Sequence, residues 1–302
     1  MDDKSSQVTI NFTSEPDAGE RDAVEVGIAT LRKRAHDFHS VRRATDLALA
    51  LAAPPPPERK RVEVAADDPA VIAADEAVAL EQQAFLDAMT LNAPRPTAGE
   101  TVFFGGGAAA GVASEVFAIP YHYDWRWHVG SIVFENTPDR PTGRIRVSVV
   151  GKRRCDAHAG FGIGVRANRD HWMTARSLRR SAESCRVRSG ATGAVALAEG
   201  GMEMTVMEGA NLLDVEQDKR FRFRLNPGFW SDPEEANHDS GGFGTGASIE
   251  VRWFALAGHT YQVNVGAWVL AEWTSGPHAA GDISRSSGGV VGDVLAITLF
   301  HG

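Results

Sequence analysis

Ionisable side chains alternate with aromatic and apolar ones along residues 121–129, and this is the segment whose residue types could do chemistry. His122, Asp124 and His128 are two imidazoles and a carboxylate, which can ligate zinc or transfer protons. Arg126 lies between them, and its guanidinium repels a divalent cation and is placed to pair with Asp124. The pattern predicts a hydrated charged strand face, with a metal site or metal-dependent enzyme at His122, Asp124 and His128 as an alternative.

A second candidate site lies in the longest predicted irregular segment, residues 226–246. Loops of this length in a compact domain often carry function. This segment combines aromatic rings, which could stack on a carbohydrate, with oxygen-bearing side chains, which could bind a ligand or calcium. Trp273 is a further ring for carbohydrate stacking. The ligand-binding candidates are therefore Phe229, Trp230, Asp232, Asn237, Asp239 and Trp273.

The cysteines raise the question of zinc and of compartment. Cys155 and Cys185 are the only two, and His158 follows the first at a C-x-x-H spacing. The three could supply zinc ligands, although a second closely spaced pair is missing. The first residues lack the basic and apolar parts of a secretory signal. We therefore expect a cytoplasmic protein with free thiols, with signal-less export left open.

Several function classes are disfavoured by what the sequence lacks. It contains no nucleophile elbow, phosphate loop or H-E-x-x-H motif, so a non-enzymatic role is favoured, although a triad assembled from distant residues stays open. Most of the formal net charge of −8 lies in the first 100 residues, which disfavours non-specific nucleic-acid binding. No stretch approaches the roughly 20 apolar residues of a membrane span.

The elements before residue 100 are predicted to be an arm and two helices. Residues 1–19 form the arm, part of which could pair elsewhere as a strand. Residues 20–95 form a helical hairpin region, in which the stripe Val24, Ile28, Leu31, Ala35 and Phe38 has helical spacing. A run of four prolines ends the first helix at about residue 53, and Asp68-Pro69 is a typical helix start.

Beyond residue 100 the pattern is typical of strands. Alternation in short segments predicts a mainly β domain, residues 100–302, as an antiparallel β-sandwich of jelly-roll type. Residues 194–207 are predicted to be a hairpin about Gly200-Gly201, and residues 249–265 a hairpin about Ala257-Gly258. Glycines at alternate positions of residues 160–164 leave one strand face bare, which favours close packing by an aromatic ring.

Three of these features also give a family resemblance. Residues 118–300 resemble uncharacterised bacterial β-sandwich proteins. The resemblance implies a fold and no particular activity. It is carried by Pro120-Tyr121-x-Tyr123-x-Trp125-x-Trp127, by Gly160-Phe161-Gly162-Ile163-Gly164 and by Ala257-Gly258-His259-Thr260-Tyr261.

Together these observations predict a non-enzymatic binding or self-assembly protein built on a β-sandwich. We expect the N-terminal helices to mediate a homo-oligomer or a contact with a protein partner. The alternatives are a carbohydrate-binding, lectin-like module that uses an exposed Trp230 or Trp273, and the metal-dependent enzyme described above. No cofactor is expected, with calcium or zinc as the open alternatives.

Overall fold

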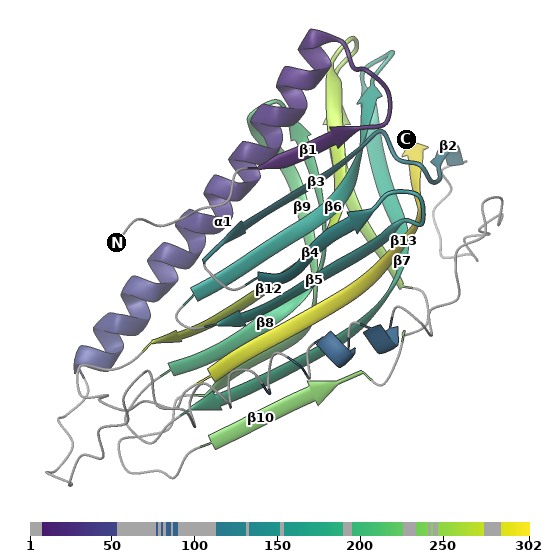
Figure 1. Ribbon diagram of the computed structural model, residues 1–302. Coiled ribbons are helices and arrows are strands. Elements are labelled where there is room, and N and C mark those ends of the chain that lie inside the picture. Colours follow the sequence, from purple (N-terminus) through teal and green to yellow (C-terminus); the bar gives the residue numbers. More distant parts are fainter. Residues whose placement is uncertain are drawn as a thin grey trace, which may run out of the picture.

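Among the residues that it describes, the computed structural model has one long helix and thirteen strands, and the strands form two sheets (Figure 1). It describes residues 8–52, 77, 80, 83–85, 87–89, 113–130, 133–151, 154–189, 195–225, 234–240, 243, 247–274 and 285–302. The elements are β1 (Thr9–Phe12), α1 (Ala18–Ala52), β2 (Ala113–Phe117), β3 (Tyr123–Val129), β4 (Val133–Asp139), β5 (Arg144–Gly151), β6 (Arg154–Arg166), β7 (His171–Ser189), β8 (Val195–Glu208), β9 (Asn211–Leu225), β10 (Glu234–Asp239), β11 (Ala247–Ala255), β12 (Thr260–Thr274) and β13 (Arg285–His301).

Each sheet is antiparallel. Sheet A has the order β1-β3-β6-β12-β8-β9, and sheet B has the order β10-β7-β13-β5-β4, with β11 also paired to β7 and β2 to β13. Residues from both sheets form the largest core cluster, including Phe161 and Val265 of sheet A and Val147 and Val290 of sheet B. The predicted antiparallel β-sandwich is therefore confirmed, whereas its jelly-roll type stays a prediction. Cys155 and Cys185 are free thiols buried in this core.

The helix α1 packs on the outer face of sheet A. It begins after Asp17, whose side-chain oxygen accepts a hydrogen bond from the Glu20 backbone N–H at 2.7 Å, the usual arrangement of an N-cap. Val24 and Ile28 are buried against the aromatic side chains of β3. Leu31 and Ala35 are partly buried against the same cluster, so the predicted stripe is confirmed from Val24 to Ala35, whereas Phe38 is 60% exposed.

The aromatic side of β3 lies under α1. It does not face the space between the two sheets, where the core of the sandwich lies. Its register pairs Tyr123 with Gly162 and Trp125 with Gly160 of β6. A Cβ at Gly162 would come within 2.1 Å of the Tyr123 ring. The predicted packing of aromatic rings over these bare positions is confirmed, and it brings the rings close to the sheet backbone.

A second helical segment covers the outer face of the other sheet. Phe85 is buried against Ala182 of β7 and Val291 of β13, and Met89 packs beside them. Phe85 and Met89 therefore contact the other sheet from the one that α1 covers. The predicted helical hairpin region, residues 20–95, stays a prediction. The predicted start at Asp68-Pro69 lies outside the described residues. Within the described residues, no helix is long and apolar enough to span a membrane.

Both predicted hairpins are corrected. Strand β8 runs without a break through Gly200-Gly201, where the pairing with β9 shifts register at a bulge. The turn at Ala257-Gly258 links β11, which pairs with β7, to β12, which pairs with β6 and β8. Gly200-Gly201 therefore lies at a bulge, and Ala257-Gly258 lies where the chain crosses from one sheet to the other. Both predictions were wrong because local sequence does not determine which strands pair.

Candidate functional site

The residues of the predicted metal face bind separate partners. Asp124 is buried, accepts a hydrogen bond from Asn11 Nδ2 at 2.7 Å and pairs with Arg140 Nε at 3.4 Å. Arg126 donates instead to the Asn136 carbonyl at 3.3 Å, so the expected Asp124–Arg126 pair is replaced. Burial raises the pKa of Asp124, and the bond from Asn11 and the charges of Arg140 and Arg126 oppose that rise.

The two histidines of this segment also stand apart from that carboxylate. His122 Nδ1 accepts a hydrogen bond from the backbone N–H of Gly164 at 3.0 Å. Burial, together with the charges of Arg32 and Arg126, lowers the pKa of His128. Across the described ranges, no group of three or more His, Cys, Asp or Glu side chains is placed to hold a metal ion. The ionisable side chains of residues 122–128 therefore make separate polar contacts.

The loop candidates are described only in part. Phe229, Trp230 and Asp232 lie outside the described residues, as does the side chain of Trp273. Asn237 and Asp239 lie in β10, an edge strand paired with β7, and both are exposed. Alternate residues of an extended strand are about 6–7 Å apart, so these two oxygens do not curve around an ion as a calcium loop does.

The possible zinc ligands of β6 point to opposite sides of sheet A. Cys155 belongs to the core between the sheets, and Cys185 of β7 lies in the same core. His158 is three residues along β6 from Cys155 and therefore faces outward, toward α1. These three groups do not share a site.

The structure reveals a groove between α1 and the outer face of sheet A. Its volume is about 400 Å³. Leu31, Arg34, Ala35 and Phe38 of α1 form one wall, and strand β9 contributes Leu212, Val215, Gln217 and Lys219 on the other side. The floor comes from β3, β6, β12 and β8. The groove thus lies where α1 leaves the close contact made by Val24 and Ile28.

Three rings form a row across the floor of the groove. The strand registers place Trp127, His158 and Trp268 opposite one another on β3, β6 and β12. The Trp127 and His158 rings are nearly parallel, with centroids 3.8 Å apart, and the His158 and Trp268 centroids are 6.2 Å apart. Trp125 lines the same floor one position along the face. The floor is therefore aromatic, and its rings are closely packed and only 1–5% exposed.

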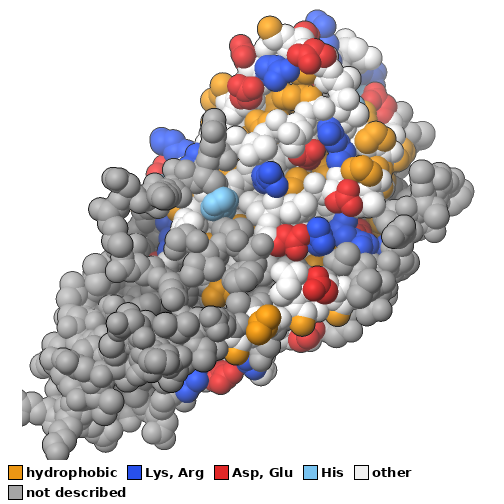
Figure 2. Space-filling view, viewed as in Figure 1, with side chains coloured by type: hydrophobic (Ala, Val, Ile, Leu, Met, Phe, Trp, Pro, Cys, Tyr) orange, Lys and Arg blue, Asp and Glu red, His pale blue; other side chains and the backbone are white. Residues whose placement is uncertain are grey.

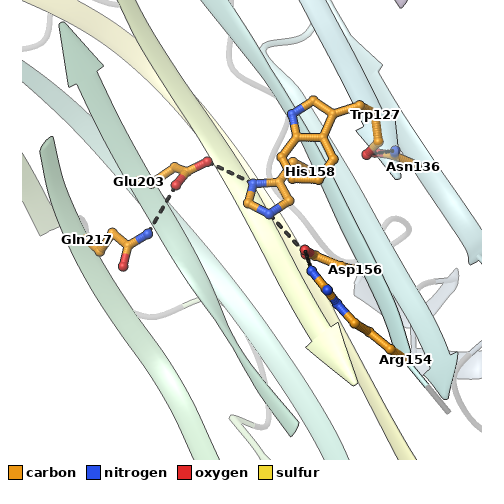
Figure 3. Close-up of polar contacts among 7 residues, drawn as sticks. All are labelled: Trp127, Asn136, Arg154, Asp156, His158, Glu203 and Gln217. Atoms are coloured by element: carbon orange, nitrogen blue, oxygen red, sulfur yellow. Dashed lines mark hydrogen bonds and ion pairs between the residues drawn. The ribbon is translucent and has the colours of Figure 1, made fainter. Parts of the chain in front are cut away.

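Two carboxylates hold the central ring of this row (Figure 3). His158 Nδ1 lies 3.0 Å from Glu203 Oε1, and His158 Nε2 lies 3.0 Å from Asp156 Oδ1. Burial alone would lower the pKa of His158, but the two carboxylates outweigh it and raise that pKa to about 9. At neutral pH both ring nitrogens therefore donate a proton. The imidazolium has no lone pair for a metal or for base catalysis.

The carboxylates of the groove are themselves paired. Asp156 Oδ2 lies 3.4 Å from Arg154 Nη2, and Glu203 Oε2 accepts a hydrogen bond from Gln217 Nε2 at 3.2 Å. On the same face, Glu199 Oε2 lies 3.5 Å from Arg222 Nε. These contacts join β6, β8 and β9 into one network, which fixes the side chains before any ligand arrives.

Several hydrogen-bond donors of the groove residues have no protein partner. The buried indole N–H groups of Trp125, Trp127 and Trp268 and the Thr205 hydroxyl make no hydrogen bond to the described residues. Buried polar groups in folded proteins nearly always have a partner, so such a cluster is unusual. These donors are buried beneath the groove and are not on its accessible surface.

The sequence prediction missed this site. It named Trp125 and Trp127 only as part of a strand pattern and gave His158 only a possible zinc role. One signal was present: Glu199 and Glu203 lie on the same face of a mostly apolar strand, where an unpaired carboxylate would be costly. That signal indicates a polar contact on one face of β8 but does not identify the strands that supply it.

Comparisons with known proteins leave the family open. No known protein family and no functionally described protein matches the sequence. Solved structures are only distantly similar. TmCBM61 in complex with β-1,4-galactotriose has a TM-score of 0.16 and 12% identity, covering 52% of this chain and 71% of its own. The K3 adhesin domain of Lys-gingipain from Porphyromonas gingivalis has a TM-score of 0.19 and 14% identity, covering 51% and 74%. Likeness at these scores carries no argument about function.

Proposed function

We propose that this protein is a non-enzymatic binding protein that takes a saccharide into the groove between α1 and sheet A. The observation that carries the proposal is one cavity of about 400 Å³ whose exposed lining includes Phe38, Val215 and Gln217. Trp125, Trp127 and Trp268 lie beneath it and are only 1–2% exposed. Aromatic and apolar side chains pack against the C–H faces of a sugar ring, and amide groups bond its hydroxyls. The volume falls within the range of small-molecule sites, about 300–1,000 Å³.

The state of the polar groups supports binding over catalysis. His158 is held as an imidazolium by two carboxylates, so it has no free nitrogen to accept a proton at neutral pH. Glu199 and Glu203 are four residues apart on one strand, about 13 Å, which exceeds the roughly 5–9.5 Å between the two carboxyl groups of glycoside hydrolases. Asp156 and Glu203 are both committed to His158.

Self-assembly through the N-terminal helices stays a prediction. The buried part of the α1 stripe, Val24 and Ile28, covers β3 of its own chain, so this surface is used within the protein. An assembly through α1 would need the side of the helix that faces away from sheet A. Light scattering on the intact chain tests this prediction separately from ligand binding.

The binding proposal is tested by filling the groove without removing its floor. Val215 lines the groove and is 43% exposed, so Val215→Trp should obstruct the ligand while leaving the fold intact. Leu213 is 40% exposed on the same strand and does not line the groove, which makes Leu213→Trp the matched control. The readouts are retention on a glycan array and isothermal titration with the retained saccharides.

We expect the unaltered protein and Leu213→Trp to bind the same saccharides, and Val215→Trp to lose at least about tenfold in affinity, since a blocked pocket forfeits its contacts. Ligand entry next to three indoles should also change the tryptophan fluorescence. Equal affinity in Val215→Trp, or silence of the unaltered protein across the array, would remove the proposal.

A further inference from the structure

The acidic side chains in and beside the groove have cationic partners, whereas two of its basic side chains have no acidic partner among the described residues. Both carboxylates on its floor already face a cation of the chain, because Glu203 faces the His158 imidazolium and Glu199 faces Arg222. Asp156, buried beneath the floor, faces Arg154. Such pairs neutralise one another at short range, and water-poor surroundings strengthen that effect. The floor of the groove therefore contributes little net negative charge.

The walls, by contrast, carry two cations without an opposite charge. Arg34 of α1 and Lys219 of β9 both line the groove, and both are exposed. Neither makes an ion pair with any residue that the structure describes, whereas many of the other arginines do. The groove is thus bordered by positive charge from two different elements.

The nearest acids along the same elements do not correct this imbalance. Asp37 is three residues from Arg34, and its carboxylate lies 3.9 Å from Lys33 Nζ. Asp218 precedes Lys219, but successive strand residues face opposite sides, and Asp218 is bound by Arg179 and Arg220. These bonds hold the pKa of Asp218 below its usual value, against the effect of burial. Both acids therefore already have cationic partners.

We propose that the saccharide bound in this groove is anionic, with a carboxylate or sulfate group that Arg34 and Lys219 bind. This inference rests on the proposed function and adds the chemical class of the ligand. A guanidinium offers paired N–H donors in a plane that matches a carboxylate, and an ammonium supplies a mobile point charge.

The test compares saccharides that differ only in charge. A glycan array carries uronate oligosaccharides beside their methyl esters, and sulfated oligosaccharides beside their desulfated forms. Each retained pair is then measured by isothermal titration at low and at physiological salt. We expect the charged member of a pair to bind at least about fivefold more tightly at low salt, and the advantage to shrink as salt rises, because exposed charges are screened.

Charge-removing variants locate the anion. Arg34→Gln and Lys219→Gln should each lower the affinity for the charged ligand about threefold to fivefold and leave the affinity for its uncharged counterpart unchanged, the usual size of a partly exposed ion pair. Arg166→Gln is the control, because it removes one exposed charge from β6, outside the groove, and leaves no acid of α1 without its partner. That variant should bind both ligands as the unaltered protein does.

The outcomes separate this inference from the proposed function. Preference for uronates or for sulfated saccharides supports the inference and identifies the anionic group. Equal affinity for charged and uncharged members overturns the inference and leaves saccharide binding in place, provided that Val215→Trp abolishes it. If neither class binds, the proposed function fails, and the inference that rests on it fails too.

Discussion

At the scale of single residues, the arrangement around His158 has the most consequences. A buried imidazole between two carboxylates is held as a cation, and its ring lies flat against Trp127, where the indole face also favours a positive charge. The protonated ring satisfies Asp156 and Glu203 at once. The same proton that stabilises the groove floor therefore also prevents His158 from acting as a base.

The stability of the protein should depend on the charge of His158. Its pKa of about 9 in the folded protein lies above the ordinary value of 6.5, so the folded state binds the proton more tightly than the unfolded chain. The contribution to the free energy of unfolding should be complete below about pH 6.5 and should disappear as the pH rises through about 9. Its full size should be on the order of 3 kcal/mol.

Urea denaturation between about pH 6 and pH 10 checks this prediction. The variant His158→Gln has no titrating ring, so its stability should be lower at pH 6 and should lack this part of the decline at high pH. A parallel decline in the variant and in the unaltered protein would assign the effect to other groups.

The glycines of β6 should be intolerant of a side chain where an aromatic ring lies above them. In Gly162→Ala the new methyl group would meet the Tyr123 ring at 2.1 Å, and that ring is held by a hydrogen bond to Asn264 at 2.8 Å. We expect a loss of about 1–3 kcal/mol, typical of an overpacked site. Thermal unfolding measures it.

The control lies on the same face of the same strand. In Gly164→Ala the nearest atom is the carboxylate of Glu20 at 3.0 Å, the end of a flexible side chain that can move aside. This variant should lose clearly less stability than Gly162→Ala. Similar losses would show that flexibility of β6, rather than ring packing, explains the preference for glycine.

At the scale of elements, α1 does two things along its length. Its first half is held close to sheet A, where Val24 and Ile28 bury the aromatic side of β3 and Gly27 approaches the Gly209 carbonyl. Further along, Arg34 and Phe38 line the groove. Close packing of Val24 and Ile28 on sheet A therefore sets the position of the groove wall further along α1.

Weakening the first half of α1 should affect both stability and binding. Ile28 is 1% exposed, so Ile28→Ala should cost about 2–4 kcal/mol through lost burial and a cavity against β3. Ligand affinity should fall as well, because α1 carries one wall of the groove. Val26 is 46% exposed on the same helix, and Val26→Ala should change neither quantity measurably. Thermal unfolding and titration with the array-selected saccharide give the two readouts.

At the scale of the whole molecule, the β-sandwich has helical segments on both outer faces. Tyr123, Trp125 and Trp127 would be exposed without α1, and Phe85 covers part of sheet B. On the face seen in Figure 2, acidic and basic side chains are interspersed and form no broad region of one sign among the described residues. Recognition on that face would depend on individual contacts rather than on a large electrostatic field.

The N-terminal elements should be required for a stable sandwich. Removing residues 1–52 deletes β1, the edge partner of β3, and α1, which covers the outer face of sheet A. We expect a lower melting temperature, red-shifted tryptophan emission and aggregation, because a large aromatic surface and a strand edge become exposed. A truncated protein that stays monomeric with unchanged emission would show that the β domain folds independently of these elements.

Much of the fold could be predicted because it is encoded by local periodicity. Alternation along residues 121–129 indicates a strand with one aromatic side, and the spacing of Val24 and Ile28 indicates a helix with one buried side, since these patterns depend only on the geometry of each element. The contacts of the predicted site residues could not be predicted in this way. His122, Asp124 and His128 share a strand face, but their partners come from distant segments that spacing does not identify.

The sequence by itself therefore determined the class of this protein: a mainly β chain with amphipathic helices before it, and a β6 face bare enough for aromatic rings. Only the tertiary structure decided what covers the aromatic side of β3, because an apolar side is satisfied equally by a second sheet or by a helix. That choice placed Trp127, His158 and Trp268 in one row under α1. The candidate site arises from strand register between segments far apart in the chain, and register is a property of the assembled sheet.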